Sequence, residues 1–221
     1  CNNRPWSLYK NWYRKDGEYV CSRPLNLGFS MKGEALREKI KEMLDLQNKI
    51  NEKVHPNWRE QNFEWYRAIW VECAELLDHY GWKWWKKQNP NQAQIELELV
   101  DIWHFGLSIL LSKYDIEKSI SLISEVMTDQ RGSGKFRENL EDFTSNTLQT
   151  RSFDLKRFNQ VMNDVGLTFE KLYVGYISKN VLNSFRQDKG YQAGTYIKDW
   201  GGIEDNEYLI RLASKIDPKS E

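Results

Sequence analysis

The sequence lacks an excess of charge of either sign, and it lacks a long apolar run. Its 221 residues include 32 Lys and Arg against 32 Asp and Glu, so the formal net charge is zero. That balance argues against a nucleic-acid coat protein and against a polybasic membrane surface, both of which need excess positive charge. No run of about 18 or more apolar residues occurs, so we expect no transmembrane helix. Neither nucleic acid nor a membrane is an expected partner.

Cysteine is scarce, and the common phosphate-binding motifs are missing. The three cysteines, Cys1, Cys21 and Cys73, are an odd number without the spacing of a metal site. Cys73 lies in an apolar helical stretch, where a free thiol packs as a small core residue. This usage suggests a reduced, intracellular protein. Because no P-loop or Gly-rich dinucleotide fingerprint is present, phosphate binding would depend on side chains and metal.

Helical periodicity runs through nearly the whole chain. Apolar residues recur every three or four positions, and no period-2 alternation is strong enough to assign a strand. Expected helices cover 33–54, 61–80, 92–113, 115–128, 136–149, 154–165, 168–187 and 205–216. A chain of this length suits one domain. We therefore predict an all-α helical bundle over residues 31–221, with residues 1–30 as an appendage outside the core fold.

Two pairs of acidic residues lie on consecutive predicted helices. Glu72 and Glu75 form the first pair, and Glu98 and Asp101 form the second. The i, i+3 spacing places both acids of a pair on one helix face. Glu98 and Asp101 fall among apolar residues, where a buried carboxylate is costly unless a cation compensates its charge. Ordinary solvated acids would explain the first pair alone, but for the second pair we favour metal binding.

Four carboxylates from two helices would form an oxygen-only, negative cage, which selects Mg²⁺ or Mn²⁺ over Zn²⁺. Two or more such ions can activate a water molecule and neutralise a leaving pyrophosphate, so this pattern suggests phosphoanhydride hydrolysis. A di-iron bundle is a weaker alternative, because such bundles take a Glu-x-x-His motif from each of two helices. Here only Asp101 and His104 resemble that motif.

Candidate base-reading residues lie in two segments. Gln47 and Asn51 occupy i, i+4 positions in the apolar stripe of the first predicted helix. Buried amides need hydrogen-bond partners, which another helix or the edge of a nucleobase would supply equally well. Trp82 follows the first acidic helix and offers a stacking surface, although most tryptophans are simply core residues.

Candidate phosphate-binding residues lie near the C-terminus. Lys179, Asn183 and Arg186, at i, i+4 and i+7, share a narrow arc of one predicted helix. Cationic and amide donors at this spacing suit polyphosphate oxygens, and the structural alternative is a solvated basic face. Tyr191 and Lys198 follow in the next predicted loop.

Five blocks in this order resemble the dimeric all-α dUTPases, relatives of the MazG-type NTP pyrophosphohydrolases and of phage dCTP pyrophosphatases. The resemblance runs from about Met31 to Glu207, and residues 129–153 match it poorly. One E-x-x-E motif is common, but five blocks in register are specific. The blocks are Leu46-Gln47-x-x-x-Asn51, Glu72-Cys73-Ala74-Glu75-Leu76, Trp82-Lys83-x-Trp85-Lys86, Glu98-x-x-Asp101-Ile102-Trp103-His104-Phe105 and Lys179-Asn180-Val181-Leu182-Asn183-x-Phe185-Arg186-Gln187-x-x-Gly190-Tyr191.

The resemblance implies a cytoplasmic homodimer that hydrolyses dUTP to dUMP and pyrophosphate, and also dUDP to dUMP and phosphate. It implies two or more Mg²⁺ ions, replaceable by Mn²⁺, and one carboxylate that activates water, for which we select Glu72. The implied metal ligands and catalytic residues are Glu72, Glu75, Glu98 and Asp101. The implied substrate contacts are Gln47, Asn51, Trp82, Lys86, Lys179, Asn183, Arg186, Tyr191 and Lys198.

Two alternatives stay open at the level of residue chemistry. A dCTP-specific or broader pyrophosphohydrolase would need the same fold and metal site, since an amide can flip to suit uracil or cytosine. A non-catalytic helical binding protein, anchored by lipid through Cys1, is an alternative from another class. It predicts no metal dependence.

Overall fold

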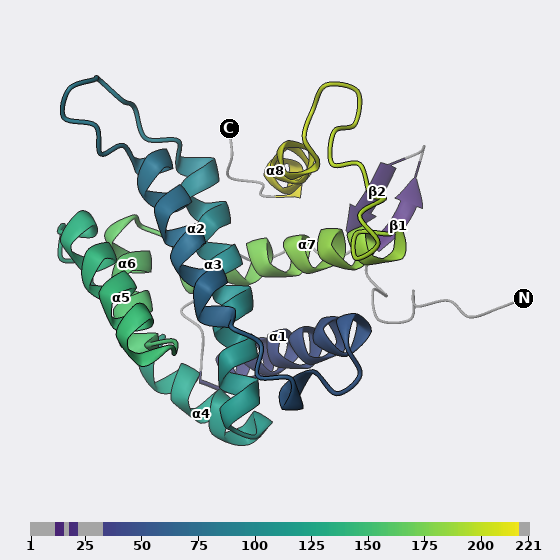
Figure 1. Cartoon of the computed structure of the whole chain (residues 1–221), viewed down its shortest axis with the longest axis horizontal. Coiled ribbons are helices and arrows are strands. Elements are labelled where there is room, and N and C mark those ends of the chain that lie inside the picture. The colour runs from purple at the N-terminus through teal and green to yellow at the C-terminus, as the bar shows by residue number, and fades with distance from the viewer. Residues whose placement is uncertain (1–11, 16–17, 22–32, 217–221) are drawn as a thin grey trace, which may run out of the picture.

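The computed structural model describes the backbone of residues 12–15, 18–21 and 33–216 and the side chains of residues 33–212. Over residues 33–216 the protein is an all-α bundle (Figure 1). This confirms the predicted fold class. A short 3-10 helix, η2, follows the first α-helix. The α-helices are α1 (Gly33–Val54), α2 (Trp65–Tyr80), α3 (Gln92–Lys113), α4 (Ile116–Val126), α5 (Phe136–Thr150), α6 (Leu155–Asp164), α7 (Phe169–Asp188) and α8 (Asp205–Ile216).

The helices are arranged around a central antiparallel pair, α2 and α3 (Figure 1). Helices α1 and α7 pack against α3 on one side of this pair, and α5 packs against α2 on the other, with α6 behind it. Helix α4 contacts α1, α3 and α6, and α8 lies against α7. None of the described helices is long and apolar enough to cross a membrane.

Helix α3 is the central element of the core, as its apolar sequence predicts. It begins after Asn91, whose side chain caps the helix by accepting a hydrogen bond from the Gln94 backbone N–H. Trp103 is fully buried and stacks on Phe158, with ring centroids 5.4 Å apart. A helix buried on nearly every side holds its few polar side chains in fixed positions, and these include the second acidic pair.

Cys73 confirms its predicted place in the core. It is a free, buried cysteine of α2, and burial raises the pKa of its thiol to about 12. The thiol therefore stays protonated and packs as an apolar group.

Most helix boundaries lie within two residues of the predicted positions, but α2 begins at Trp65 rather than at residue 61. Asn62 has a φ of 51°, a left-handed backbone conformation that a helix cannot include. The preceding residues form the 3-10 helix η2 (Trp58–Glu60) instead. Helical periodicity does not show this break, because Asn tolerates the left-handed region without a glycine.

The prediction that the chain has no strand was wrong at one place. Strands β1 (Trp12–Lys15) and β2 (Glu18–Cys21) form an antiparallel hairpin, with Trp12 opposite Cys21. The missed signal is Asp16-Gly17, a dipeptide favoured in two-residue hairpin loops. The hairpin lies within residues 1–30, and that this segment is an appendage remains a prediction.

Residues 129–153, which resemble the dUTPases poorly, include α5. Its buried residues Phe136, Leu140 and Phe143 belong to the main hydrophobic core. Asp164 holds the start of this segment: its carboxylate accepts hydrogen bonds from Asn139 Nδ2, in the first turn of α5, at 2.6 Å and from Gly134 N, before α5, at 3.2 Å. This segment is therefore part of the bundle.

Helices α3 and α7 approach closely at Gly175. A Cβ atom on Gly175 would lie 2.8 Å from Val100 Cγ2, well inside van der Waals contact. The absence of a side chain lets α7 cross α3 at this point. Lys179 lies one helical turn after Gly175 on α7, and Asp101 is the residue after Val100 on α3. The close crossing of the two helices therefore brings the Lys179 ammonium near the Asp101 carboxylate.

Candidate active site

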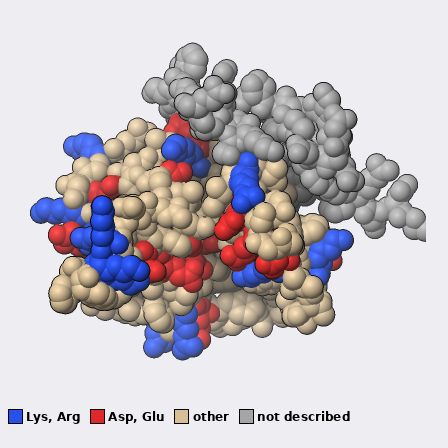
Figure 2. All heavy atoms as spheres, turned by 90° about the horizontal axis from the view of Figure 1, so that it is seen from above, with Lys and Arg blue, Asp and Glu red and all other residues tan. Residues whose placement is uncertain are grey.

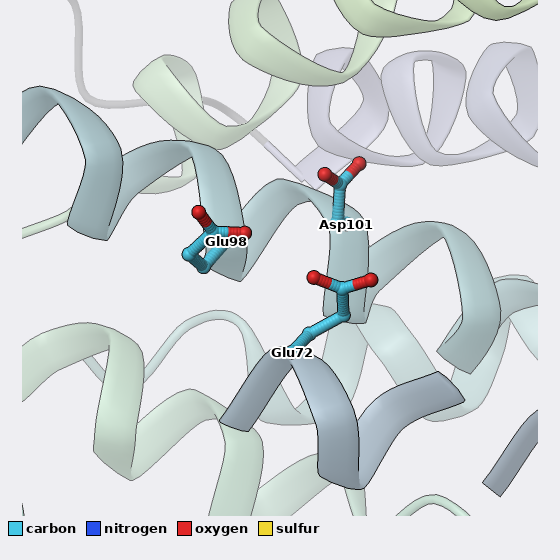
Figure 3. Close-up of side chains that lie close together, drawn as sticks. All are labelled: Glu72, Glu98 and Asp101. Atoms are coloured by element: carbon cyan, nitrogen blue, oxygen red, sulfur yellow. The ribbon is translucent and has the colours of Figure 1, made fainter. Parts of the chain in front are cut away.

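Three carboxylates from the two central helices converge. Glu72 reaches from α2 towards α3, which carries Glu98 and Asp101 (Figure 3). Each residue offers an oxygen atom, and these three atoms lie within 4.8 Å of one another. Glu98 is buried, whereas Glu72 and Asp101 are half-buried. The structure therefore brings together three of the four acids that the helical spacing selected.

Glu75 is the fourth acid, and it lies outside this group of three. Its side chain is exposed on α2, one turn after Glu72. Its charge still reaches the group, because it contributes to raising the pKa of both Glu72 and Glu98. Glu75 thus stands at the rim of the carboxylate group.

The carboxylates lack enough positive charge of their own. Burial, followed by the charges of Asp101 and Glu72, raises the pKa of Glu98 to about 8. Burial and the charges of Asp101 and Glu75 raise the pKa of Glu72 to about 7. Like charges gathered in a partly buried place favour protonation unless a cation joins them. The donor set consists of carboxylate oxygens alone, which fits a hard divalent cation.

Lys179 supplies one positive charge to this group. Its ammonium lies 2.7 Å from Asp101 Oδ2, and the lysine side chain is almost fully buried. It also donates to Asn206 Oδ1 at 3.0 Å. Lys179 therefore joins α3, α7 and the first turn of α8. Asn206 was not selected from the sequence, because nothing in its spacing links it to residues of α7.

A second cluster surrounds Arg186. Its guanidinium donates to both oxygens of Asp205, at 2.9 Å from Nε and 2.7 Å from Nη2, and to Asn183 Oδ1 at 3.4 Å. The guanidinium lies 5.8 Å from the Tyr191 ring centroid, and the Lys198 ammonium lies 5.9 Å from the same centroid. Four predicted phosphate-binding residues thus lie in one cluster, in which Arg186 forms an ion pair with Asp205. The other three are Asn183, Tyr191 and Lys198. Asp205 was missed, because an acid at the start of a helix is common for reasons of capping alone.

Gln47 and Asn51 form a buried network with α3. Gln47 Nε2 donates to Asn51 Oδ1 and to Ser108 Oγ, both at 3.0 Å, and Asn51 Nδ2 donates to Ser108 Oγ at 2.9 Å. Ser108 Oγ in turn donates its only hydrogen to the His104 carbonyl oxygen at 3.1 Å. Both amides therefore pair with another helix, one of the two interpretations from the sequence, and contact with a nucleobase stays a prediction.

His104 belongs to the same network and is electrically neutral. Burial and the Lys179 charge lower the pKa of His104 to about 3. Its Nδ1 lies 2.8 Å from Gln47 Oε1, so Nδ1 carries the hydrogen and donates it. No histidine belongs to the described group of possible metal ligands. His104 therefore gives no support to a di-iron site.

Residues 39–191, more than half of the chain, match the family model described as dUTPase. The chain belongs to the dUTPase family. It is therefore a nucleotide pyrophosphohydrolase with dUTP diphosphatase activity, and the recognition made from the five sequence blocks is confirmed. None of the curated proteins compared with the chain matches it.

Family membership settles which class of protein the bundle represents. The dUTPases depend in general on a divalent metal, and the acidic group on α2 and α3 provides a place for one. Their substrate is a nucleotide. The alternative of a non-catalytic binding protein is thereby excluded.

Trp82 and Lys86 lie apart from the carboxylates, in the loop between α2 and α3. Trp82 is 43% exposed, and its Nε1 donates to Asp78 Oδ1 at 3.0 Å. Lys86 is exposed. Neither forms a hydrogen bond or ion pair with the carboxylate group in the part of the chain with described side chains. On the face that carries this loop and α8, acidic side chains gather in the middle and basic ones lie mainly around them (Figure 2).

Proposed function

We propose that this dUTPase hydrolyses dUTP to dUMP and pyrophosphate, and dUDP to dUMP and phosphate, with two or more Mg²⁺ ions held by Glu72, Glu98 and Asp101. Glu75, at the rim, completes the ligand set. The observation that supports this proposal is the convergence of three carboxylate oxygens within 4.8 Å. An all-oxygen site of this kind also accepts Mn²⁺.

Glu72 is our candidate for the residue that orients and deprotonates the attacking water. Bound divalent ions would neutralise phosphate oxygens and make water more acidic. In the metal-free protein the pKa of Glu72 is raised to about 7, and a bound divalent ion would lower it. The choice of Glu72 therefore rests on its position on α2, from which it faces the two carboxylates of α3 (Figure 3). Glu72 would then serve both as a ligand and as the base, with Glu98 and Asp101 on the opposite helix as ligands alone.

The cations on α7 and in the loop after it are the candidate phosphate-binding groups. Lys179 lies beside the carboxylates, and Arg186 and Lys198 lie around Tyr191. Together with Asn183 they offer donors of the kind that bind polyphosphate oxygens. We assign Gln47, Asn51 and Trp82 to the uracil base and Lys86 to the edge of the substrate site.

We further propose that the enzyme is a cytoplasmic homodimer and that residues 31–221 form its single domain. Exposed apolar side chains on α2 support dimerisation. Trp70 is 40% exposed and Val71 is 41% exposed on a helix whose opposite face packs in the core. Such surface suits burial against a second copy of the chain.

The test is pyrophosphate release from dUTP, dCTP, dTTP and UTP, each measured with Mg²⁺ and with EDTA. We expect turnover that requires Mg²⁺ and strongly favours dUTP. Preference for dCTP would keep the metal site but overturn the assignment of the base. Undiminished turnover in EDTA would overturn the role of the carboxylates as metal ligands.

A further inference from the structure

Asp205 is the most completely buried acid in the part of the chain with described side chains. It is the first residue of α8, and its side chain has no exposed surface. It lies beyond residues 39–191, the segment that matches the dUTPase family. A buried carboxylate is stable only when charged and hydrogen-bonding partners surround it. The residues that bond to Asp205 are therefore the residues whose positions Asp205 fixes.

The partners of Asp205 outside α8 belong to the basic cluster or to the loop that carries it. Its carboxylate accepts two hydrogen bonds from Arg186 and one, at 2.8 Å, from the Tyr196 hydroxyl. Its backbone N–H donates to the Lys198 carbonyl oxygen at 2.9 Å. One residue thus fixes a guanidinium on α7 and the backbone of a lysine in the loop.

The fixed geometry has a consequence for the guanidinium. A bidentate pair restrains both the position and the plane of an arginine side chain. The Nε and Nη2 donors of Arg186 face Asp205 and Asn206, and Nη1 donates to Asn183 Oδ1. Asn206 Oδ1, next in the chain, receives hydrogen bonds from both Lys179 and Arg186 and so links this pair to the carboxylate group.

We propose that Asp205 is a positioning residue for dUTP hydrolysis, which holds Arg186 and Lys198 where they bind the polyphosphate. This inference rests on the proposed role of those two cations. Asp205 touches neither substrate nor metal. It acts by keeping the two cations in one arrangement before the substrate arrives, so that binding does not have to order them.

The test compares Asp205→Asn with Glu204→Gln in the full chain. The Asn variant keeps the shape of the side chain but removes the charge that orients Arg186. We expect KM for dUTP to rise by about tenfold or more, with a smaller change in kcat, since misplaced binding groups weaken productive binding. The exposed side chain of the neighbour Glu204 has no hydrogen bond or ion pair with either cation among the described residues, so Glu204→Gln should match the wild type.

A double-mutant cycle shows whether Asp205 acts through Arg186. The combined Asp205→Asn, Arg186→Gln variant should have a KM no higher than Arg186→Gln alone, because the positioned group is already lost. Independent, additive effects would overturn the proposal. Binding of Mn²⁺ without nucleotide, measured by calorimetry, should be unchanged by Asp205→Asn, because Asp205 does not contact the carboxylates.

Other outcomes are equally informative. An unchanged KM in Asp205→Asn, with wild-type enzyme active on dUTP, overturns this inference and leaves the proposed function intact. Inactive wild type overturns the proposed function. If Asp205→Asn fails to fold, Arg186→Lys replaces it, since lysine keeps the charge but cannot form the bidentate pair. A normal KM in that variant would overturn the proposal.

Discussion

Asp101 is the one carboxylate of the acidic group that already has a cationic partner. Lys179 neutralises it at 2.7 Å, whereas Glu98 has only His79 Nε2 at 3.3 Å and no lysine or arginine. The remaining negative charge therefore falls on Glu72 and Glu98. Burial, together with the neighbouring carboxylates, raises the pKa of both groups, and this makes the stability of the metal-free enzyme depend on pH.

We expect the metal-free enzyme to lose stability as the pH rises. The pKa of Glu98 is about 8 and that of Glu72 about 7, against an ordinary value of 4.5. The folded state keeps protons that the unfolded chain releases, so the stabilisation present below about pH 4.5 disappears as the pH rises through 8. Urea unfolding in EDTA between about pH 5 and pH 8 measures this slope.

Glu98→Gln should flatten that slope and raise the free energy of unfolding in EDTA by about 1 kcal/mol or more at neutral pH. It should also abolish most dUTP turnover. Glu96→Gln, two positions earlier on α3 and paired with Lys171, is the control. A Glu98→Gln variant that is less stable than the wild type in EDTA would contradict this account of the charges.

The residues of the site differ in how far the sequence predicts them. Glu72, Glu98 and Asp101 follow from helical spacing and apolar surroundings, because local geometry fixes which face they occupy. Asp205 and Asn206 depend on how α8 packs against α7. No sequence pattern within α7 or α8 alone predicts how these two helices pack.

The crossing of α3 and α7 is the contact between elements that most directly shapes the site. Gly175 allows it, since a Cβ there would lie 2.8 Å from the buried side chain of Val100. Val100 is β-branched and cannot move aside easily. A larger residue at 175 would push α7, and Lys179 with it, away from α3.

We therefore expect Gly175→Ala to lower both stability and activity. Alanine would otherwise stabilise a helix by about 1 kcal/mol relative to glycine, but overpacking against Val100 costs about 1–3 kcal/mol. The matched control is Gly33→Ala, where a Cβ meets nothing within 4 Å. Thermal unfolding and dUTP turnover measure the two effects. If Gly175→Ala were as stable as Gly33→Ala, the crossing would not be tight.

Helix positions follow well from periodicity, and the two departures have local causes. The left-handed conformation of Asn62 delays the start of α2, and the sequence signal for the pairing of β1 with β2 is a dipeptide rather than a period. Packing partners do not follow in the same way. Nothing in the sequence of α5 shows that it packs on α2.

At the scale of the whole molecule, the proposed site draws its residues from α1, α2, α3, α7 and α8, from the loop between α2 and α3, and from the loop before α8. None of them lies in residues 1–30. We expect a protein of residues 31–221 to keep its kcat and KM for dUTP and to sediment as a dimer, as the full chain should. Loss of activity in the shortened protein, with its melting temperature unchanged, would show that residues 1–30 contribute to the site.

With Gln47 and Asn51 in their proposed role as base-reading residues, the network around Ser108 would limit which pyrimidine they accept. Because Ser108 can only accept from Gln47 and Asn51, both amides are held in one orientation and cannot flip. Uracil and cytosine present opposite polarity at two edge positions, so an amide with a fixed orientation suits one base and opposes the other. Substitution of Ser108, inside the bundle, would therefore be the simplest way to change the preferred base, and Asn51 itself would not have to change.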